Sequence, residues 1–182
     1  PAFFQMGKTG QAAVIGFGTG ITVGNLALHP EIKNIDCIEI SDVVKDFAKH
    51  FAEHNLNAAT DPKVNWILAD AFRALISIPK TYDVIISEPS NPWVTGVERL
   101  YSQDFYQLIK DKLSPGGVYA QWFHTYSIAP DTLGLVINTY HSVFPHVYTF
   151  LSAGADLIIL GSIQEIGPEQ IATMKSRFNN PA

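Results

Sequence analysis

The chain has 182 residues, of which 47% are hydrophobic and 16% are charged, and its net charge is −5. This length and composition predict one globular domain over residues 1–182 and exclude a disordered chain. The acidic balance, without any basic run, excludes electrostatic binding to nucleic acid and to anionic membranes. A single cysteine, Cys37, excludes an intramolecular disulfide, and its apolar neighbours predict a buried side chain. No apolar run has the length of a membrane-spanning helix and no signal peptide is recognisable, so we expect a cytoplasmic protein without direct membrane insertion.

Short apolar runs alternate with helical stretches along the whole chain. The first four runs are nearly continuous, which is typical of parallel strands covered on both faces. The predicted strands are 12–16, 35–40, 64–69, 82–87, 118–123, 147–151 and 157–161. The predicted helices are 21–28, 42–55, 71–76, 102–112, 130–143 and 165–178. This alternation predicts an α/β fold with a doubly wound, mostly parallel, Rossmann-like sheet of seven strands.

Glycines follow the first predicted strand at the edge of the sheet where such folds bind ligands. Gly16, Gly18 and Gly20 open the next predicted helix, so backbone N–H groups can approach a ligand closely. The dinucleotide fingerprint requires a glycine or alanine where this chain has Ile21. The spacing therefore favours a nucleoside of the S-adenosylmethionine type, and a tight strand-to-helix turn without a ligand is the alternative.

Carboxylates end the second and third predicted strands. Glu39 has the position of an acceptor for two ribose hydroxyls, and its alternative role is an exposed acid near a helix start. Asp70 precedes Ala71, where the third helix is predicted to begin. It can accept from the exocyclic amine of adenine, cap that helix, or do both, because a cap uses one oxygen.

A stiff loop with two prolines follows the fourth predicted strand. It holds Glu88, Asn91 and Trp93. An amine attacking a sulfonium donor must first lose a proton, and Glu88 is the candidate acceptor for it. The alternative is an acid that only holds the loop or pairs with Arg99. His124, just past the fifth predicted strand, is a candidate for the wall of the acceptor pocket, together with Gln121 and Trp122.

Taken together, these motifs resemble the spermidine synthase family. The resemblance covers roughly residues 12–162 and rests on the order and spacing of five groups. These are Gly16–Gly20, Glu39, Asp70 with Ala71, Glu88 with Asn91 and Pro92, and Leu100–Tyr106.

The resemblance implies the fold of class I S-adenosylmethionine-dependent methyltransferases, with an antiparallel last strand. It implies decarboxylated S-adenosylmethionine as aminopropyl donor and a small amine such as putrescine as acceptor, without a metal. Gly16, Gly18, Gly20, Glu39, Asp70 and Ala71 would bind the donor. Glu88 would be catalytic, and Asn91, Trp93, Gln121 and His124 would bind the acceptor. It further implies a homodimer or a larger, membrane-attached parent protein as the setting of this domain.

The sequence departs from the family at the acceptor half of the site. Members normally carry Asp at the positions of Glu88 and Asn91, so one negative charge is absent here. They also begin with a small β domain, of which residues 1–11 are interpreted as a remnant. Two other functions stay open: a methyltransferase that uses S-adenosylmethionine, and a non-catalytic nucleoside-binding module of a larger protein.

Overall fold

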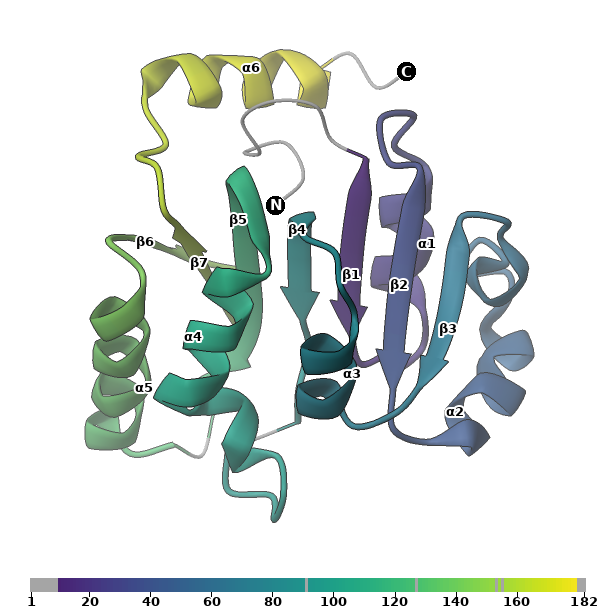
Figure 1. Cartoon of the computed structure of the whole chain (residues 1–182), viewed down its shortest axis with the longest axis horizontal. Coiled ribbons are helices and arrows are strands. Elements are labelled where there is room, and N and C mark those ends of the chain that lie inside the picture. Colours follow the sequence, from purple (N-terminus) through teal and green to yellow (C-terminus); the bar gives the residue numbers. More distant parts are fainter. Residues whose placement is uncertain (1–9, 91, 127, 153, 155, 180–182) are drawn as a thin grey trace.

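A single sheet with helices on both faces forms the protein (Figure 1). The computed structural model describes residues 10–90, 92–126, 128–152, 154 and 156–179. Its strands are β1 (Gln11–Ile15), β2 (Asn34–Glu39), β3 (Val64–Leu68), β4 (Tyr82–Ser87), β5 (Leu113–His124), β6 (His146–Leu151) and β7 (Asp156–Ser162). Its α-helices are α1 (Ile21–Ala27), α2 (Asp42–Phe47), α3 (Ala71–Ser77), α4 (Gln103–Asp111), α5 (Pro130–Val143) and α6 (Pro168–Asn179). Short 3₁₀ helices are η2 (Ala48–Phe51), η3 (Ala58–Thr60) and η4 (Glu98–Tyr101).

The strand order confirms the predicted doubly wound sheet. The order is β3-β2-β1-β4-β5-β7-β6, in which β1 to β5 run parallel and β7 runs antiparallel to both β5 and β6. From β1 the chain winds outward to β2 and β3, and it then returns to place β4 on the other side of β1. This reversal leaves a crevice beyond the carboxyl ends of β1 and β4, where folds of this kind bind ligands.

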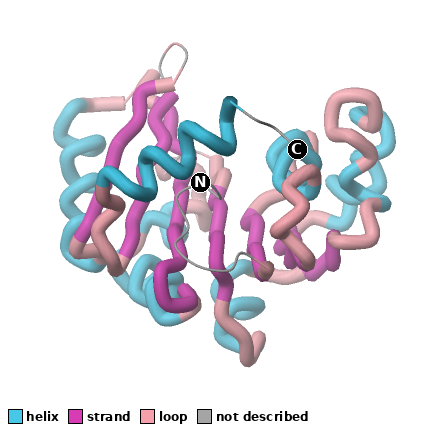
Figure 2. The backbone as a smooth tube through the Cα atoms, turned by 90° about the horizontal axis from the view of Figure 1, so that it is seen from above, coloured by secondary structure: helices cyan, strands magenta, loops and turns pink. Residues whose placement is uncertain are grey.

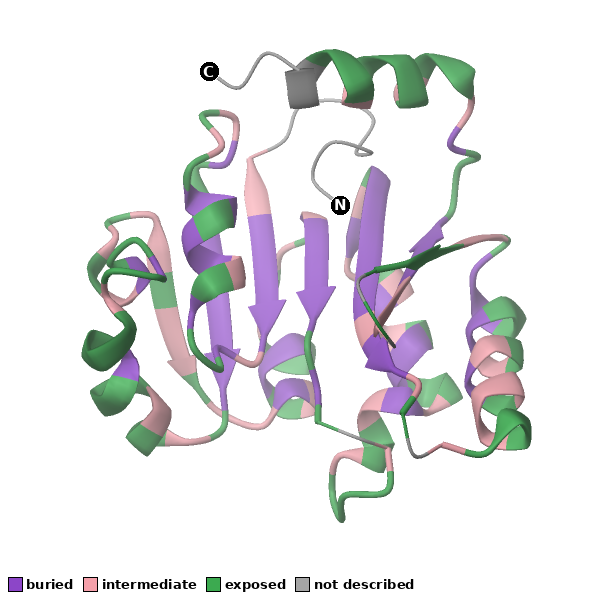
Figure 3. Ribbon diagram, turned by 180° about the vertical axis from the view of Figure 1, so that it is seen from behind, coloured by how far each residue is buried: buried purple, intermediate pink, exposed green. Residues whose placement is uncertain are grey.

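Two hydrophobic cores hold the layers together. Figure 2 shows the helices arranged around the strands, and Figure 3 shows that the central strands are largely buried. Helices α3, α4 and α5 cover one face of the sheet, and their buried side chains meet residues such as Ala13 and Ile85. Helix α1 covers the other face with the short η2 and η3. Because the central strands are buried on both sides, the near-continuous apolar runs in the sequence are explained.

Two elements differ from the sequence-based expectation. The helix predicted over 42–55 ends at Phe47 and continues as η2. Its apolar side is only partly a core face: Val44 packs against the core, whereas Val43 and Phe47 are 56% and 58% exposed. Strand β5 begins at Leu113, five residues before the start of the strand predicted over 118–123. A register shift between Tyr82 and Val84 of β4 accommodates these extra residues. Of residues 1–11, only Gly10 and Gln11 lie among the described residues.

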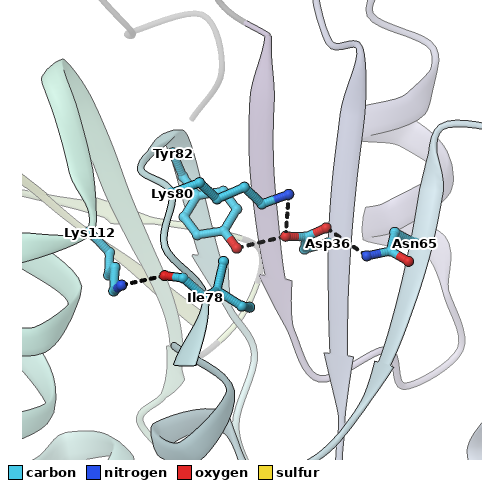
Figure 4. A network of polar contacts seen from close by, with 6 residues as sticks. All are labelled: Asp36, Asn65, Ile78, Lys80, Tyr82 and Lys112. Atoms are coloured by element: carbon cyan, nitrogen blue, oxygen red, sulfur yellow. Dashed lines mark hydrogen bonds and ion pairs between the residues drawn. The ribbon is translucent and has the colours of Figure 1, made fainter. Parts of the chain in front are cut away.

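A buried carboxylate ties three strands together at the edge of the sheet opposite the crevice (Figure 4). Asp36 is 1% exposed. It accepts hydrogen bonds from Tyr82 Oη at 2.7 Å and Asn65 Nδ2 at 3.0 Å, and it pairs with Lys80 Nζ at 2.6 Å. Burial by itself raises the pKa of Asp36, but the three hydrogen bonds and the charge of Lys80 outweigh it and hold that pKa below its ordinary value.

We expect Lys80→Met to lower the free energy of unfolding at pH 7 by about 1–3 kcal/mol, because it removes the cation that faces a buried carboxylate. Lys80 is 39% exposed, which places the effect below that of a fully buried pair. The stability that Asp36 contributes is present above the unfolded pKa of about 3.9 and is lost as pH falls through the lower folded value.

The difference between wild type and Lys80→Met should therefore shrink in urea titrations as pH is lowered from neutral to about 3, below that unfolded pKa. Lys112→Met is the matched control, because Lys112 Nζ donates to the carbonyl of Ile78, which does not titrate. A difference for Lys80→Met that is constant over this range would contradict the assignment.

Candidate active site

A cavity of about 580 Å³ opens at the carboxyl edge of the sheet. It is bounded by the ends of β1, β2, β3 and β4 and by the chain that leads into η4. The structure brings together six of the predicted site residues in its lining: Gly16, Gly18, Glu39, Asp70, Ala71 and Glu88. Residues from four separate strand ends thus meet in one cavity.

The glycine loop has a backbone that only glycine adopts without strain. Gly16, Gly18 and Gly20 have φ values of 85°, 55° and 82°. A Cβ on Gly20 would lie 2.3 Å from the Phe17 ring, and one on Gly16 would lie 3.3 Å from the carbonyl oxygen of Glu88. At Gly18 the space is open. Packing and turn geometry therefore require glycine at positions 16 and 20, whereas Gly18 leaves room in the cavity.

Glu39 is fixed by the backbone around it. Its Oε2 accepts from Phe17 N and its Oε1 accepts from Ser41 N, both at 2.9 Å. The side chain is 8% exposed and still lines the cavity. A carboxylate offers about four lone-pair positions, so two remain for a ligand's hydroxyl groups. Glu39 lies just before α2 but is buried, so it is not the exposed acid of the alternative interpretation.

Asp70 combines a helix cap with a place in the cavity wall. Its Oδ1 accepts from Arg73 N at 3.1 Å as the N-cap of α3. Oδ2 has no hydrogen-bond partner within the part of the chain that the structure describes. Ile40 also lines the cavity and is 74% exposed. Together they give the cavity one polar acceptor beside an uncovered apolar surface, which suits a heteroaromatic base.

Glu88 faces α1. Its Oε1 accepts from Thr22 Oγ1 at 2.5 Å, and its backbone N donates to the carbonyl of Ile15 at 3.1 Å. The alternative partner Arg99 lies over the Phe72 ring, 4.8 Å from its centroid. No ion pair joins Arg99 to Glu88 among the described residues. Thr22 was missed by sequence reasoning, although its place in the first turn after the glycine loop could have indicated it.

The predicted acceptor residues lie elsewhere. Gln121 is fully buried, and its amide accepts from Tyr106 Oη at 2.7 Å and donates to the carbonyl of Leu100 at 3.2 Å. Trp93 is 50% exposed and His124 is 6% exposed, and their ring centroids are 5.9 Å apart. These three residues are not part of the cavity lining. Asn91 lies outside the described residues.

The thiol of Cys37 is buried as predicted, and its burial, together with the charge of Glu39, raises its pKa to about 12. It is thus protonated at neutral pH. Within the described ranges, no three His, Cys, Asp or Glu side chains are grouped as metal ligands would be. The described part of the chain also has no helix of sufficient length and apolar character to cross a membrane.

The sequence matches the Spermine/spermidine synthase domain over residues 2–154. A polyamine aminopropyltransferase of Aeropyrum pernix is 28% identical over 82% of this chain and 49% of its own length. Putrescine N-methyltransferase 1 of Nicotiana tabacum is 31% identical over 63% of this chain and 32% of its own length.

In fold, the chain is similar to a spermidine synthase crystallised with the transition-state analogue AdoDATO. The TM-score is 0.83 at 20% identity, with 95% of this chain and 60% of that chain covered. The chain thus spans about half the length of the Aeropyrum relative and somewhat more of this solved structure. Because the family match extends over most of the chain, the protein belongs to the spermine/spermidine synthase family.

Proposed function

We propose that this domain transfers an aminopropyl group from decarboxylated S-adenosylmethionine to a small amine such as putrescine. The observation that carries this proposal is the position of Glu88, whose carboxylate lies in the same cavity as Glu39 and Asp70. One carboxylate can thus serve the acceptor while the other two hold the nucleoside. Family membership supports the same reaction.

The donor is bound along the cavity by groups that the fold has already oriented. Glu39 accepts hydrogen bonds from the ribose hydroxyls with the lone pairs that Phe17 and Ser41 leave free. Asp70 Oδ2 accepts from the exocyclic amine of adenine, next to Ala71. Gly18 leaves space beside the aminopropyl chain. Backbone N–H groups already hold the carboxylates of Glu39 and Asp70, which lowers the entropic cost of binding.

The reaction needs a neutral nucleophile and a leaving group. The acceptor ammonium gives a proton to Glu88, and the free amine attacks the aminopropyl carbon bonded to sulfur. A new C–N bond forms as the C–S bond breaks. The electron pair of the C–S bond stays on sulfur, so methylthioadenosine leaves uncharged. Thr22 holds the Glu88 carboxylate in place through its hydroxyl hydrogen bond.

Methyl transfer is the second candidate function. The same cavity accommodates the same nucleoside, and the similarity to putrescine N-methyltransferase favours this alternative specifically. In that case the methyl carbon of S-adenosylmethionine is attacked, and Glu88 again accepts the proton of the amine. The two reactions differ in the donor that the protein prefers.

The donor preference is tested by calorimetric titration with S-adenosylmethionine, its decarboxylated form and methylthioadenosine. We expect the decarboxylated donor to bind at least about tenfold more tightly than the carboxylated one, a difference of about 1.4 kcal/mol. Preference for S-adenosylmethionine itself would favour methyl transfer over aminopropyl transfer as the reaction of this domain. If none of the three compounds binds, the domain would be a non-catalytic module.

In the same titration, Glu39→Gln should weaken methylthioadenosine binding about 10- to 100-fold. The new amide NH₂ would face the N–H of Phe17 or of Ser41, so the glycine loop would lose a fixed partner. Glu169→Gln, at the exposed start of α6, is the matched control and should bind as wild type. Equal affinities for all three proteins would show that Glu39 does not hold the ribose.

Glu88→Gln should lower turnover about a hundred- to ten-thousand-fold, because an amide cannot accept the acceptor's proton. Donor affinity should stay at the wild-type value, since Glu88 lies at the acceptor end of the cavity. Turnover is followed by the release of methylthioadenosine, and donor affinity by calorimetry. Wild-type turnover in Glu88→Gln would remove this residue from the mechanism.

Thr22→Val should lower kcat up to about tenfold, the effect of one lost hydrogen bond, with little change in donor affinity. Thr22→Ser keeps the hydroxyl group and should restore kcat. A purely structural role of Thr22 predicts equal losses of stability and activity in both variants. Thermal unfolding and initial rates, measured on the same samples, separate the two cases.

A further inference from the structure

Asn55 is a buried amide next to the glycine loop. The side chain is 1% exposed and is not part of the cavity lining. Its Nδ2 donates to the carbonyl of Thr19 in the glycine loop at 2.9 Å and to the carbonyl of Ala48 in η2 at 3.1 Å. One NH₂ group therefore joins the glycine loop to the segment that continues α2.

This amide makes its two hydrogen bonds while one of its own atoms stays unpaired. Oδ1 is buried and has no hydrogen-bond partner within the described part of the chain. The orientation of the amide is fixed, because an NH₂ group can satisfy two backbone carbonyls and an oxygen cannot. A buried oxygen without a partner is destabilising. A hydrocarbon side chain would fill the space without this cost, so the property that distinguishes an amide here is its pair of donors.

The backbone around Asn55 is held as closely as its side chain. A Cβ on Gly24 of α1 would lie 2.1 Å from the Asn55 carbonyl oxygen, so α1 approaches this backbone directly. The N–H of Asn55 donates to the carbonyl of Phe51 at 2.8 Å. Leu56 and Asn57 follow with φ values of 57°, a conformation that costs energy in residues other than glycine. Such a conformation persists where surrounding contacts enforce it, so Asn55 has one fixed position.

The glycine loop is therefore held by two side chains of opposite chemistry. Glu39 accepts from the N–H of Phe17 and lines the cavity. Asn55 donates to the carbonyl of Thr19 and lies outside the lining. Gly18 lies between these two held residues and is itself part of the lining. A displacement of Thr19 would therefore move the cavity wall at Gly18.

The second hydrogen bond of Asn55 connects the loop to another wall of the cavity. Ala48 is buried in the core and begins η2. Val44, one turn earlier in α2, lines the cavity and packs against the same core. The two acceptors of Asn55 thus belong to the two segments that carry Gly18 and Val44. Their relative position depends on a single amide.

We propose that Asn55 is a positioning residue for the donor, which holds the glycine loop in the conformation that receives the nucleoside. This role rests on the proposed function, in which the donor occupies the cavity. Asn55 contacts neither substrate and acts through the loop and α2. Without its donors the loop gains conformational freedom, and binding then has to restore the order that is lost. Donor affinity falls, whereas the KM of the acceptor stays unchanged.

Amide hydrogen exchange without ligand tests whether Asn55 holds the loop. In wild type the N–H groups of Phe17 and Gly20, which donate to Glu39 and to the Phe17 carbonyl, should be protected. Asn55→Ala should accelerate exchange at both about tenfold and leave the amides of β5 and β7 unchanged. Exchange at Gly20 as fast as in an unstructured peptide would overturn the proposal in wild type alone, even if no variant at this position folds. Unchanged exchange in Asn55→Ala would overturn it as well.

Calorimetry with methylthioadenosine tests the consequence for binding. Asn55→Ala should weaken binding about tenfold, the effect of one lost hydrogen bond. Asn55→Asp should weaken it at least as much, because a carboxylate has the same shape and no donor. Asn25→Ala is the matched control, since Asn25 Nδ2 donates to the carbonyl of Ile21 on the exposed side of α1. It should bind as wild type. In steady-state assays, Asn55→Ala should raise the KM of the donor and not that of the acceptor.

Lys80→Met separates positioning from a general loss of stability. It removes a contact at the opposite edge of the sheet and does not touch the loop. If it weakens methylthioadenosine binding as much as Asn55→Ala does at an equal loss of Tm, the effect follows global stability and the proposal is overturned. Wild-type affinity in Asn55→Ala would also overturn it. Absence of binding by wild type would remove the donor site and the proposed function, whereas the exchange rates decide separately whether Asn55 holds the loop.

Discussion

The architecture of the site depends on one carboxylate that joins the glycine loop to the end of β2. Glu39 accepts from Phe17 in the loop and from Ser41 at the start of α2. Each hydrogen bond fixes one side of the cavity, and both would be lost together if the carboxylate moved. Because the group that we propose to receive the ribose also orders the loop, ligand binding and loop geometry would be coupled. Such a site is organised before the ligand arrives.

Carboxylates serve opposite purposes at the two edges of the sheet. At the amino edge, Asp36 is neutralised by Lys80 and joins β2 to its neighbours. At the carboxyl edge, Glu39 and Glu88 accept only uncharged N–H or O–H donors, so their negative charge is available to a ligand. A sulfonium donor and an ammonium acceptor are both cations. The carboxylates of Glu39 and Glu88, which have no ion-pair partner among the described residues, therefore favour the proposed substrates.

Local sequence patterns predicted the sheet, and they predicted that Glu39 and Asp70 would lie at the same edge of it. Strands buried on both faces have apolar runs, and their ends place Glu39 and Asp70 at one edge regardless of side-chain detail. Sequence patterns failed where contacts with residues distant in the sequence determine the role of a side chain. Gln121 resembled a pocket residue, but its amide is used by Tyr106 and Leu100, which approach only in the folded chain. The helix expected to Asn55 ends at Phe47 and continues as η2, where Ala48 packs into the core.

The acceptor half of the proposed site differs from the family at Asn91, and this difference places more of the reaction on Glu88. With an amide at Asn91, the loop after β4 retains one acid, Glu88, where the family normally has two. A dication is then attracted less strongly near the sulfonium. In the proposed reaction, the acceptor's proton therefore goes to Glu88, whose carboxylate is held in place by the hydroxyl of Thr22.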